Sequence, residues 1–325
     1  MPHKGCPHQC SFCNQKSISG QLNGLTPEDV HSAAKKAMEN PELKNAEIAF
    51  FGGSFTAIER GYMLSLLKAA AGYIDGERFK GIRISTRPDC IDGEICSILK
   101  EYKVTAVELG AQSMSDEVLF LNHRGHSSQD VENAVKMLKS YGFETGLQMM
   151  TGLYGSDEDE SLETGRKIIA LKPDTVRIYP TVVLQNTHLA ELYKRGEYVP
   201  QTVEQAAEIC SKLLLMFHEA GIRVIRVGLH SGGNVEEGYL AGAYHPAFKE
   251  LCESRIYLNK IFNELKNKPV TQGIIYVPKG ATSQSVGQKK QNLKLLQEKG
   301  YNLTVKESID LEKYQVLVKE NAYDT

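Results

Sequence analysis

The sequence lacks long apolar runs, a strong excess of charge of either sign, and an even number of cysteines. No stretch approaches the roughly 18 apolar residues of a membrane helix, and no basic-then-apolar leader opens the chain, so we expect a cytoplasmic protein. The net charge of −2 neither favours nor excludes nucleic acid as a partner. With seven cysteines in a chain of 325 residues, metal ligation is a better expectation than a disulfide framework.

The chain alternates between short apolar segments and helical patterns of about 10–15 residues, which is typical of parallel strands joined by crossover helices. Glycine and polar residues follow nearly every expected strand. In a barrel, these loops form one active-site face, so the pattern favours an α/β fold with a partial (β/α)6-type TIM barrel over an open doubly wound sheet. The expected strands cover residues 47–51, 82–86, 104–109, 143–149, 175–179 and 222–227.

The pattern changes near Pro246, which predicts three parts. Residues 1–245 form the partial barrel, 246–268 a linking helix, and 269–325 a small α+β appendage with a helix over about residues 283–299. Only five residues precede Cys6, so the strand that should carry the loop at Cys6 is missing. We therefore expect the native N-terminus to extend upstream of Met1.

Three cysteines, Cys6, Cys10 and Cys13, are separated by three and then two residues. Three thiolates on one short loop can bind one metal centre together. They are one fewer than the four that close an iron–sulfur cluster or a structural zinc site, so one position stays open for a ligand. The alternative is a zinc knuckle completed by His3 or His8.

This spacing, with an aromatic residue at Phe12, resembles the cluster loop of the radical S-adenosylmethionine (SAM) superfamily. The resemblance implies that Cys6, Cys10 and Cys13 hold a [4Fe–4S] cluster whose open iron binds SAM, and that an electron donor such as ferredoxin or flavodoxin reduces it. Cleavage of SAM then yields a 5′-deoxyadenosyl radical.

The same resemblance assigns SAM-binding roles to residues that follow the later strands. It places the methionine amino group at Gly52-Gly53-Ser54, the ribose or methionine part at Gln112, and the carboxylate at Arg124, whose fork suits it. Gln148 stands where these relatives carry a ribose-binding Asp, and an amide can also bond a hydroxyl.

A wider set of motifs resembles the radical-SAM half of the Elongator catalytic subunit family, which modifies the wobble uridine of tRNA. More distantly, the chain resembles oxygen-independent coproporphyrinogen oxidases. The residues after about 230 are too few for an acetyltransferase domain with its own core and contain no convincing acyl-CoA loop. The motifs are Phe50–Thr56, Ser85–Asp89, Gly110–Ser113, Arg124–His126 and Val176–Val183.

The resemblance therefore predicts an enzyme that modifies RNA, with tRNA as the expected partner. Two alternatives stay open. One is radical chemistry on a small molecule such as a porphyrinogen, and the other is a non-catalytic iron–sulfur binding protein.

The appendage offers a further hint of RNA binding. Residues 286–292 resemble a KH-type segment, in which a Gly-x-x-Gly loop clamps a nucleotide backbone. Lys290 replaces the second glycine, and it forms with Lys289 a basic pair that suits phosphate. A solvated helix face is the alternative.

Four further residues near the expected strands of the barrel are candidates for a site. His230, Tyr244 and His245 follow the last barrel strand and are candidates for the substrate mouth. Tyr179 is a candidate for contacts to adenine, or for packing alone.

Overall fold

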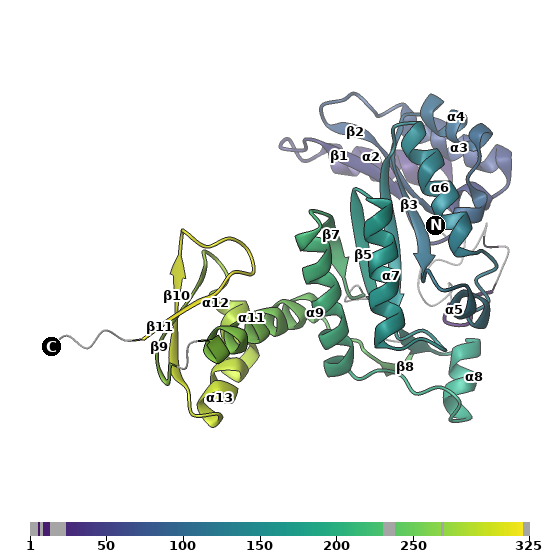
Figure 1. Cartoon of the computed structure of the whole chain (residues 1–325). Coiled ribbons are helices and arrows are strands. Elements are labelled where there is room, and N and C mark those ends of the chain that lie inside the picture. Colours follow the sequence, from purple (N-terminus) through teal and green to yellow (C-terminus); the bar gives the residue numbers. More distant parts are fainter. Residues whose placement is uncertain (1–5, 7–8, 14–23, 230–237, 268–269, 321–325) are drawn as a thin grey trace.

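A computed structural model describes residues 6, 9–13, 24–229, 238–267 and 270–320. Its main part is a parallel six-stranded sheet, in the order β1-β2-β3-β4-β5-β7, curled into a half-barrel (Figure 1). The predicted fold class is therefore confirmed. The strands are β1 (Ala46–Phe50), β2 (Phe79–Thr86), β3 (Val104–Gln112), β4 (Glu144–Thr151), β5 (Thr175–Pro180) and β7 (Arg223–Val227).

Helices alternate with these strands, and local capping fixes where several of them begin. The Thr26 side chain accepts from the Asp29 amide while Asp29 bonds back, a reciprocal pair that Ser127 and Asp130 repeat. Two 3₁₀ turns, η1 (Phe55–Ala57) and η2 (Pro88–Cys90), follow β1 and β2. The helices are α2 (Pro27–Met38), α3 (Arg60–Ala71), α4 (Gly93–Glu101), α5 (Asp116–Leu121), α6 (Ser128–Ser140), α7 (Glu158–Leu171), α8 (His188–Lys194) and α9 (Val203–Glu219).

The two faces of the sheet have opposite character because successive side chains in a strand point to opposite sides. One face is apolar and belongs to the main core; its central side chains include Ile84, Leu109, Met149 and Ile178, each fully buried. The alternate positions form a polar face, with Arg83, Glu108, Gln148 and Arg177 on four successive strands. This polar face is the one available to a site.

A two-stranded sheet lies beyond the ends of the main strands. It pairs β6 (Val182–Leu184) with β8 (Tyr239–Gly242) in antiparallel fashion. The sequence did not predict β6, β8 or α8. A strand of three or four residues gives little periodic signal, and its pairing partner lies far away in the chain.

The C-terminal part is built on α11 (Phe248–Asn267), which leads from the half-barrel to a three-stranded sheet in the order β10-β9-β11 (Figure 1). The predicted single helix over 283–299 is wrong: Gly287, Lys289 and Lys290 all have positive φ, which a continuous helix does not allow. The elements are β9 (Gln272–Pro278), α12 (Thr282–Val286), η3 (Gln288–Lys290), α13 (Gln291–Glu298), β10 (Asn302–Ser308) and β11 (Leu317–Glu320).

The boundaries predicted for the three parts, at residues 245 and 268, stay a prediction. Among the described helices, none is both long enough and apolar enough to cross a membrane.

Candidate cofactor site

The cysteine loop is fastened to the half-barrel through Ser11. Its amide donates to the Asn122 carbonyl at 3.1 Å and its hydroxyl to Asn122 Oδ1 at 2.8 Å, just after α5. Its carbonyl accepts from the Leu189 amide in α8 at 2.8 Å. Phe12 packs against an apolar group that includes Leu189 and Tyr198. The aromatic residue and α8 thus anchor the loop.

The three predicted cluster cysteines lie on this loop at different depths. Cys10 is buried, whereas Cys6 and Cys13 are partly exposed, and Cys6 Sγ lies 3.6 Å from Ser54 Oγ. In the described part of the chain, no three Cys, His, Asp or Glu side chains are placed to hold one metal ion. The cluster assignment therefore depends on the donor set, three thiols on one loop, and His3 and His8 lie outside the described residues.

Arg124 connects the loop to β3. This buried side chain donates from Nη1 to Cys10 Sγ at 3.1 Å and from Nη2 to the Gly110 carbonyl at 2.6 Å. The Arg87 side chain donates to the backbone carbonyl of Arg124 and so stabilises the position of this residue. Within the described residues, Arg124 Nε has no hydrogen-bond partner although it is buried. A buried guanidinium with an unused donor is costly unless a ligand completes it.

Gln112 supplies a complementary unused acceptor. It ends β3 with φ +67°, at an irregularity in the register with β4, and its buried Oε1 also lacks a partner among the described residues. A Cβ added to Gly110 would lie 2.9 Å from Gln112 Nε2 and 3.3 Å from Arg124 Nη2, so the two side chains share one small space. A donor and an acceptor without partners among the described residues, on two side chains that border one space, fit the carboxylate and ammonium of an amino acid. The residues present thus fit the methionine part of SAM.

His126 contacts the backbone of β3 between Gly110 and Gln112. Its Nε2 lies 3.2 Å from the Ala111 carbonyl, and Nδ1 is buried without a partner in the described residues. Burial, with the nearby charges of Arg124 and Arg87, lowers the pKa of His126 to about 4. At neutral pH the ring is uncharged, with Nε2 donating and Nδ1 left as an acceptor.

The glycine pair lies where the sequence predicted it, directly after β1. Gly52 has φ +97°, a conformation that side chains other than hydrogen rarely allow, and the adjacent Ser54 is buried. Through Ser54 this turn meets Cys6. The structure thus brings Ser54, and with it the turn that contains Gly52 and Gly53, next to Cys6.

Gln148 lies in different surroundings from the other predicted cofactor residues. Its Nε2 donates to Glu108 Oε2 at 3.1 Å on the polar face of the sheet. Of the candidates for the substrate mouth, His230 lies outside the described residues, and His245 Nδ1 accepts from the Ala247 amide just before the start of α11.

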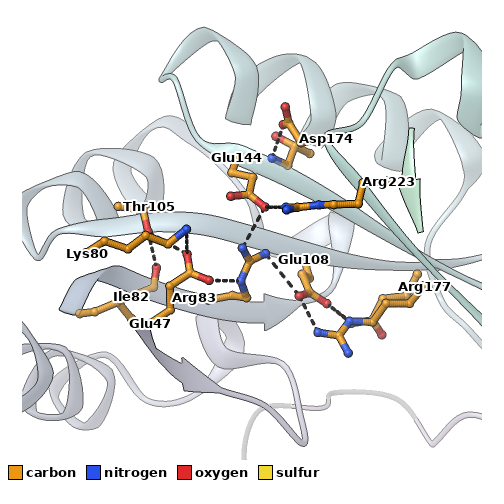
Figure 2. Close-up of polar contacts among 12 residues, drawn as sticks. Glu47, Lys80, Ile82, Arg83, Thr105, Glu108, Glu144, Asp174, Arg177 and Arg223 are labelled. Atoms are coloured by element: carbon orange, nitrogen blue, oxygen red, sulfur yellow. Dashed lines mark hydrogen bonds and ion pairs between the residues drawn. The ribbon is translucent and has the colours of Figure 1, made fainter. Parts of the chain in front are cut away.

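The sequence analysis missed an ion-pair network across the polar face, shown in Figure 2. Arg83 binds Glu47 at 2.7 Å, Glu144 at 2.9 Å and Glu108 at 3.4 Å, and Arg177 binds Glu108 at 2.5 and 2.9 Å. Burial alone would lower the pKa of Arg83, but its bonds to Glu47 and Glu144 raise it overall. The sequence holds only a partial signal of the network, isolated charged residues inside otherwise apolar strands, and it does not say which of these charges meet.

Comparisons with known proteins agree with this fold. The Radical SAM superfamily model matches residues 1–168, and a Radical_SAM C-terminal domain matches residues 173–258. A tRNA uridine(34) acetyltransferase of Methanocaldococcus jannaschii is 34% identical over 248 residues, covering 63% of this chain and 46% of that protein. Elongator complex protein 3 of Homo sapiens is 27% identical over 195 residues, covering 54% of this chain and 36% of that protein.

A solved structure of archaeal Elp3 from Methanocaldococcus infernus, lacking its N-terminus, has the same fold. The TM-score is 0.62 at 24% identity, and the match covers 75% of this chain and 59% of that one. The chain spans about half the length of the curated acetyltransferase relatives, 46% of the one from M. jannaschii. The family model covers more than half of the chain, and the predicted resemblance is confirmed: this protein belongs to the radical SAM superfamily.

Proposed function

We propose that this enzyme binds a [4Fe–4S] cluster and SAM at the cysteine loop and uses them to start radical chemistry on a tRNA. The observation that carries the proposal is that Arg124, which donates to Cys10, and Gln112 each keep a buried polar atom, Nε and Oε1, without a partner among the described residues. When bound, the cluster and SAM together supply a reductively generated 5′-deoxyadenosyl radical.

The chain's own residues bind and orient in this proposal. Cys6, Cys10 and Cys13 would hold the cluster, and the guanidinium of Arg124 would donate hydrogen bonds both to the Cys10 sulfur and to the SAM carboxylate. Gln112 would accept from the ammonium group. Gly52, Gly53 and Ser54 would border the same group through backbone and hydroxyl. Gln148, whose Nε2 is bound to Glu108, would offer Oε1 to a ribose hydroxyl.

The choice of tRNA as substrate is supported by the relatives, two of which carry names of tRNA- or Elongator-related proteins. Because the chain covers less than half of these proteins, their acetyl-transfer activity is not part of the proposal. An electron donor such as ferredoxin or flavodoxin and a cytoplasmic location belong to the proposal. The KH-type role of residues 286–292 stays a prediction.

The test begins with anaerobic reconstitution by iron and sulfide, followed by dithionite and SAM, with 5′-deoxyadenosine measured by liquid chromatography. The wild type is expected to release 5′-deoxyadenosine. The Cys10→Ala variant should lose both iron and product, whereas the control Cys96→Ala, buried in α4, should keep both.

Two results would contradict parts of this proposal. A reconstituted wild type that makes no 5′-deoxyadenosine would favour a non-catalytic iron–sulfur protein. SAM cleavage without any tRNA binding at low salt, where phosphate contacts are strongest, would favour a small-molecule substrate.

A further inference from the structure

The ring of Phe51, which directly follows β1, lies against the guanidinium of Arg177 in β5. Arg177 Cζ is 5.1 Å from the ring centroid, within the range of a cation–π contact. Phe51 is nevertheless 36% exposed, so part of this large apolar ring faces solvent. An exposed aromatic ring beside an arginine is a surface suited to a flat ligand.

The contact bridges a wide stretch of the sheet. Strands β2, β3 and β4 separate β1 from β5. At roughly 4.8 Å per strand, a flat sheet would hold β1 and β5 about 19 Å apart, too far for these two side chains to meet comfortably. The sheet curls so that Phe51 reaches over the polar face. The Phe51–Arg177 pair therefore lies across the concave side of the half-barrel.

Two hydrogen bonds to Glu108 fix the plane of the Arg177 guanidinium. Both Nε and Nη2 donate to the two oxygens of Glu108, at 2.5 and 2.9 Å, and the Glu108 side chain is only 1% exposed (Figure 2). Glu108 is itself held by Arg83 and Gln148. A bidentate pair fixes orientation as well as position. The guanidinium is thus preorganised, and little entropy is lost when a ligand stacks beside it.

Gln148 ties this pair to the proposed cofactor site. Its Nε2 and the two nitrogens of Arg177 share one carboxylate, that of Glu108. Phe51 is the residue directly before Gly52-Gly53. The two ends of the pair therefore adjoin two segments assigned to SAM.

We infer that Phe51 and Arg177 form a wall that stacks a planar nucleobase inside the half-barrel. Every base has a π-face that stacks on an aromatic ring, and base carbonyls accept from a guanidinium. The base has two possible sources, a nucleotide of the RNA substrate and the adenine of SAM. This inference rests on the proposed function.

The first arm of the test uses a synthetic tRNA anticodon hairpin with fluorescent 2-aminopurine at nucleotide 34, the position named in the relatives. Stacking quenches this fluorophore. If the wall receives an RNA base, Phe51→Leu should lose the quenching and bind about 5- to 150-fold more weakly, as for loss of one base–aromatic stack. Phe51→Tyr, which keeps a ring, should retain it. The matched control is Phe120→Leu, which changes a 79% exposed phenylalanine on α5.

The second arm measures SAM binding to the same reconstituted variants by equilibrium dialysis. Weaker SAM binding by Phe51→Leu, with quenching unchanged, assigns the wall to adenine. Unchanged quenching and unchanged SAM affinity overturn the inference. If the wild type does not bind the hairpin at low salt, the RNA part of the proposed function fails, and the SAM arm alone decides whether the wall exists.

Discussion

The Arg124 side chain donates two hydrogen bonds and has one further buried donor, Nε, without a partner in the described residues. A substitution at this position should therefore be poorly tolerated. Lysine has a single ammonium at the end of a flexible stem and cannot reach Cys10, Gly110 and a ligand together. Arg124→Lys should therefore weaken SAM binding by about tenfold, equivalent to ~1.4 kcal/mol. Equilibrium dialysis on reconstituted protein measures this loss.

The control for this substitution is Arg166→Lys, because Arg166 is exposed and, within the described part of the chain, pairs with Glu163 alone. It should bind SAM as the wild type does. Equal affinity of Arg124→Lys and the wild type would remove Arg124 from the SAM site.

His126 predicts a pH dependence of stability whose sign follows from its lowered pKa. In the unfolded chain the ring takes up a proton near pH 6.5, whereas in the folded protein it stays neutral until about pH 4. Its contribution to stability is thus complete above pH 6.5 and is lost as the pH falls toward 4. A shift of this size corresponds to roughly 3 kcal/mol.

The His126→Gln variant should remove this contribution, because an amide can still donate to the Ala111 carbonyl but does not titrate. Urea unfolding of the metal-free protein at several pH values should show a shallower loss of stability below pH 6.5. His31→Gln, which changes an exposed histidine, should follow the wild-type curve. Parallel curves for His126→Gln and the wild type would contradict the buried, neutral ring.

At the scale of elements, four adjacent strands are joined by charges as well as by backbone hydrogen bonds. Glu108 in β3 is the centre, because it binds Arg83 in β2, Gln148 in β4 and Arg177 in β5. Glu108→Gln would leave the buried guanidinium of Arg83 and the partly buried guanidinium of Arg177 without full compensation. We expect it to lower the free energy of unfolding by about 3–5 kcal/mol.

Denaturant unfolding checks this expectation. Glu163→Gln is the matched control, because the Glu163 carboxylate is half exposed and, among the residues that the structure describes, pairs with Arg166 alone. Its effect on the free energy of unfolding should stay within about 0.5 kcal/mol. A loss below about 1 kcal/mol for Glu108→Gln would mean that water or rearrangement compensates the two arginines.

The six main strands were predictable because each is a short apolar run bounded by glycine or polar residues, and the rule for parallel strands then gives the fold. The ion-pair network between these strands could not be predicted in the same way. Arg83, Glu108 and Arg177 are spaced singly in three distant segments, and only the register of the sheet brings them together. Gln148 is an example of this limit. The resemblance predicted that it binds the cofactor, whereas in the structure its side chain donates a hydrogen bond to Glu108.

The break between α12 and α13 shows a second limit of sequence reasoning. The apolar periodicity of residues 283–299 favours one helix, and a single glycine does not rule it out. In the structure, the buried Asn292 donates to Ser254 and Ser285, and this tertiary contact fixes the turn at Gly287. Periodicity alone carries no information on such a contact.

At the scale of the whole molecule, α11 lies between the half-barrel and the small three-stranded sheet of the C-terminal part, β10-β9-β11. Towards the half-barrel, α11 packs against α9. Towards the small sheet, Tyr314 donates through its hydroxyl to Glu253 and through its amide to the Tyr257 hydroxyl. Because one helix contacts both parts, the small sheet is held in a defined relation to the half-barrel, so an RNA bound to both would be bound at a fixed spacing.

The last prediction concerns the basic turn of the small sheet. Lys289 and Lys290 are exposed, and their positive φ values present both side chains in one tight turn beside the first residues of α13. If this turn meets RNA phosphates, the double substitution Lys289→Ala, Lys290→Ala should reduce the slope of log affinity against log salt by about 1.4, at about 0.7 for each phosphate contact with a single strand. The control is Lys35→Ala, Lys36→Ala, an exposed pair in the last turn of α2, which should leave the slope unchanged. Titrations of tRNA at several salt concentrations decide the matter, because equal slopes for wild type and the Lys289/Lys290 variant would assign the turn to a solvated helix end.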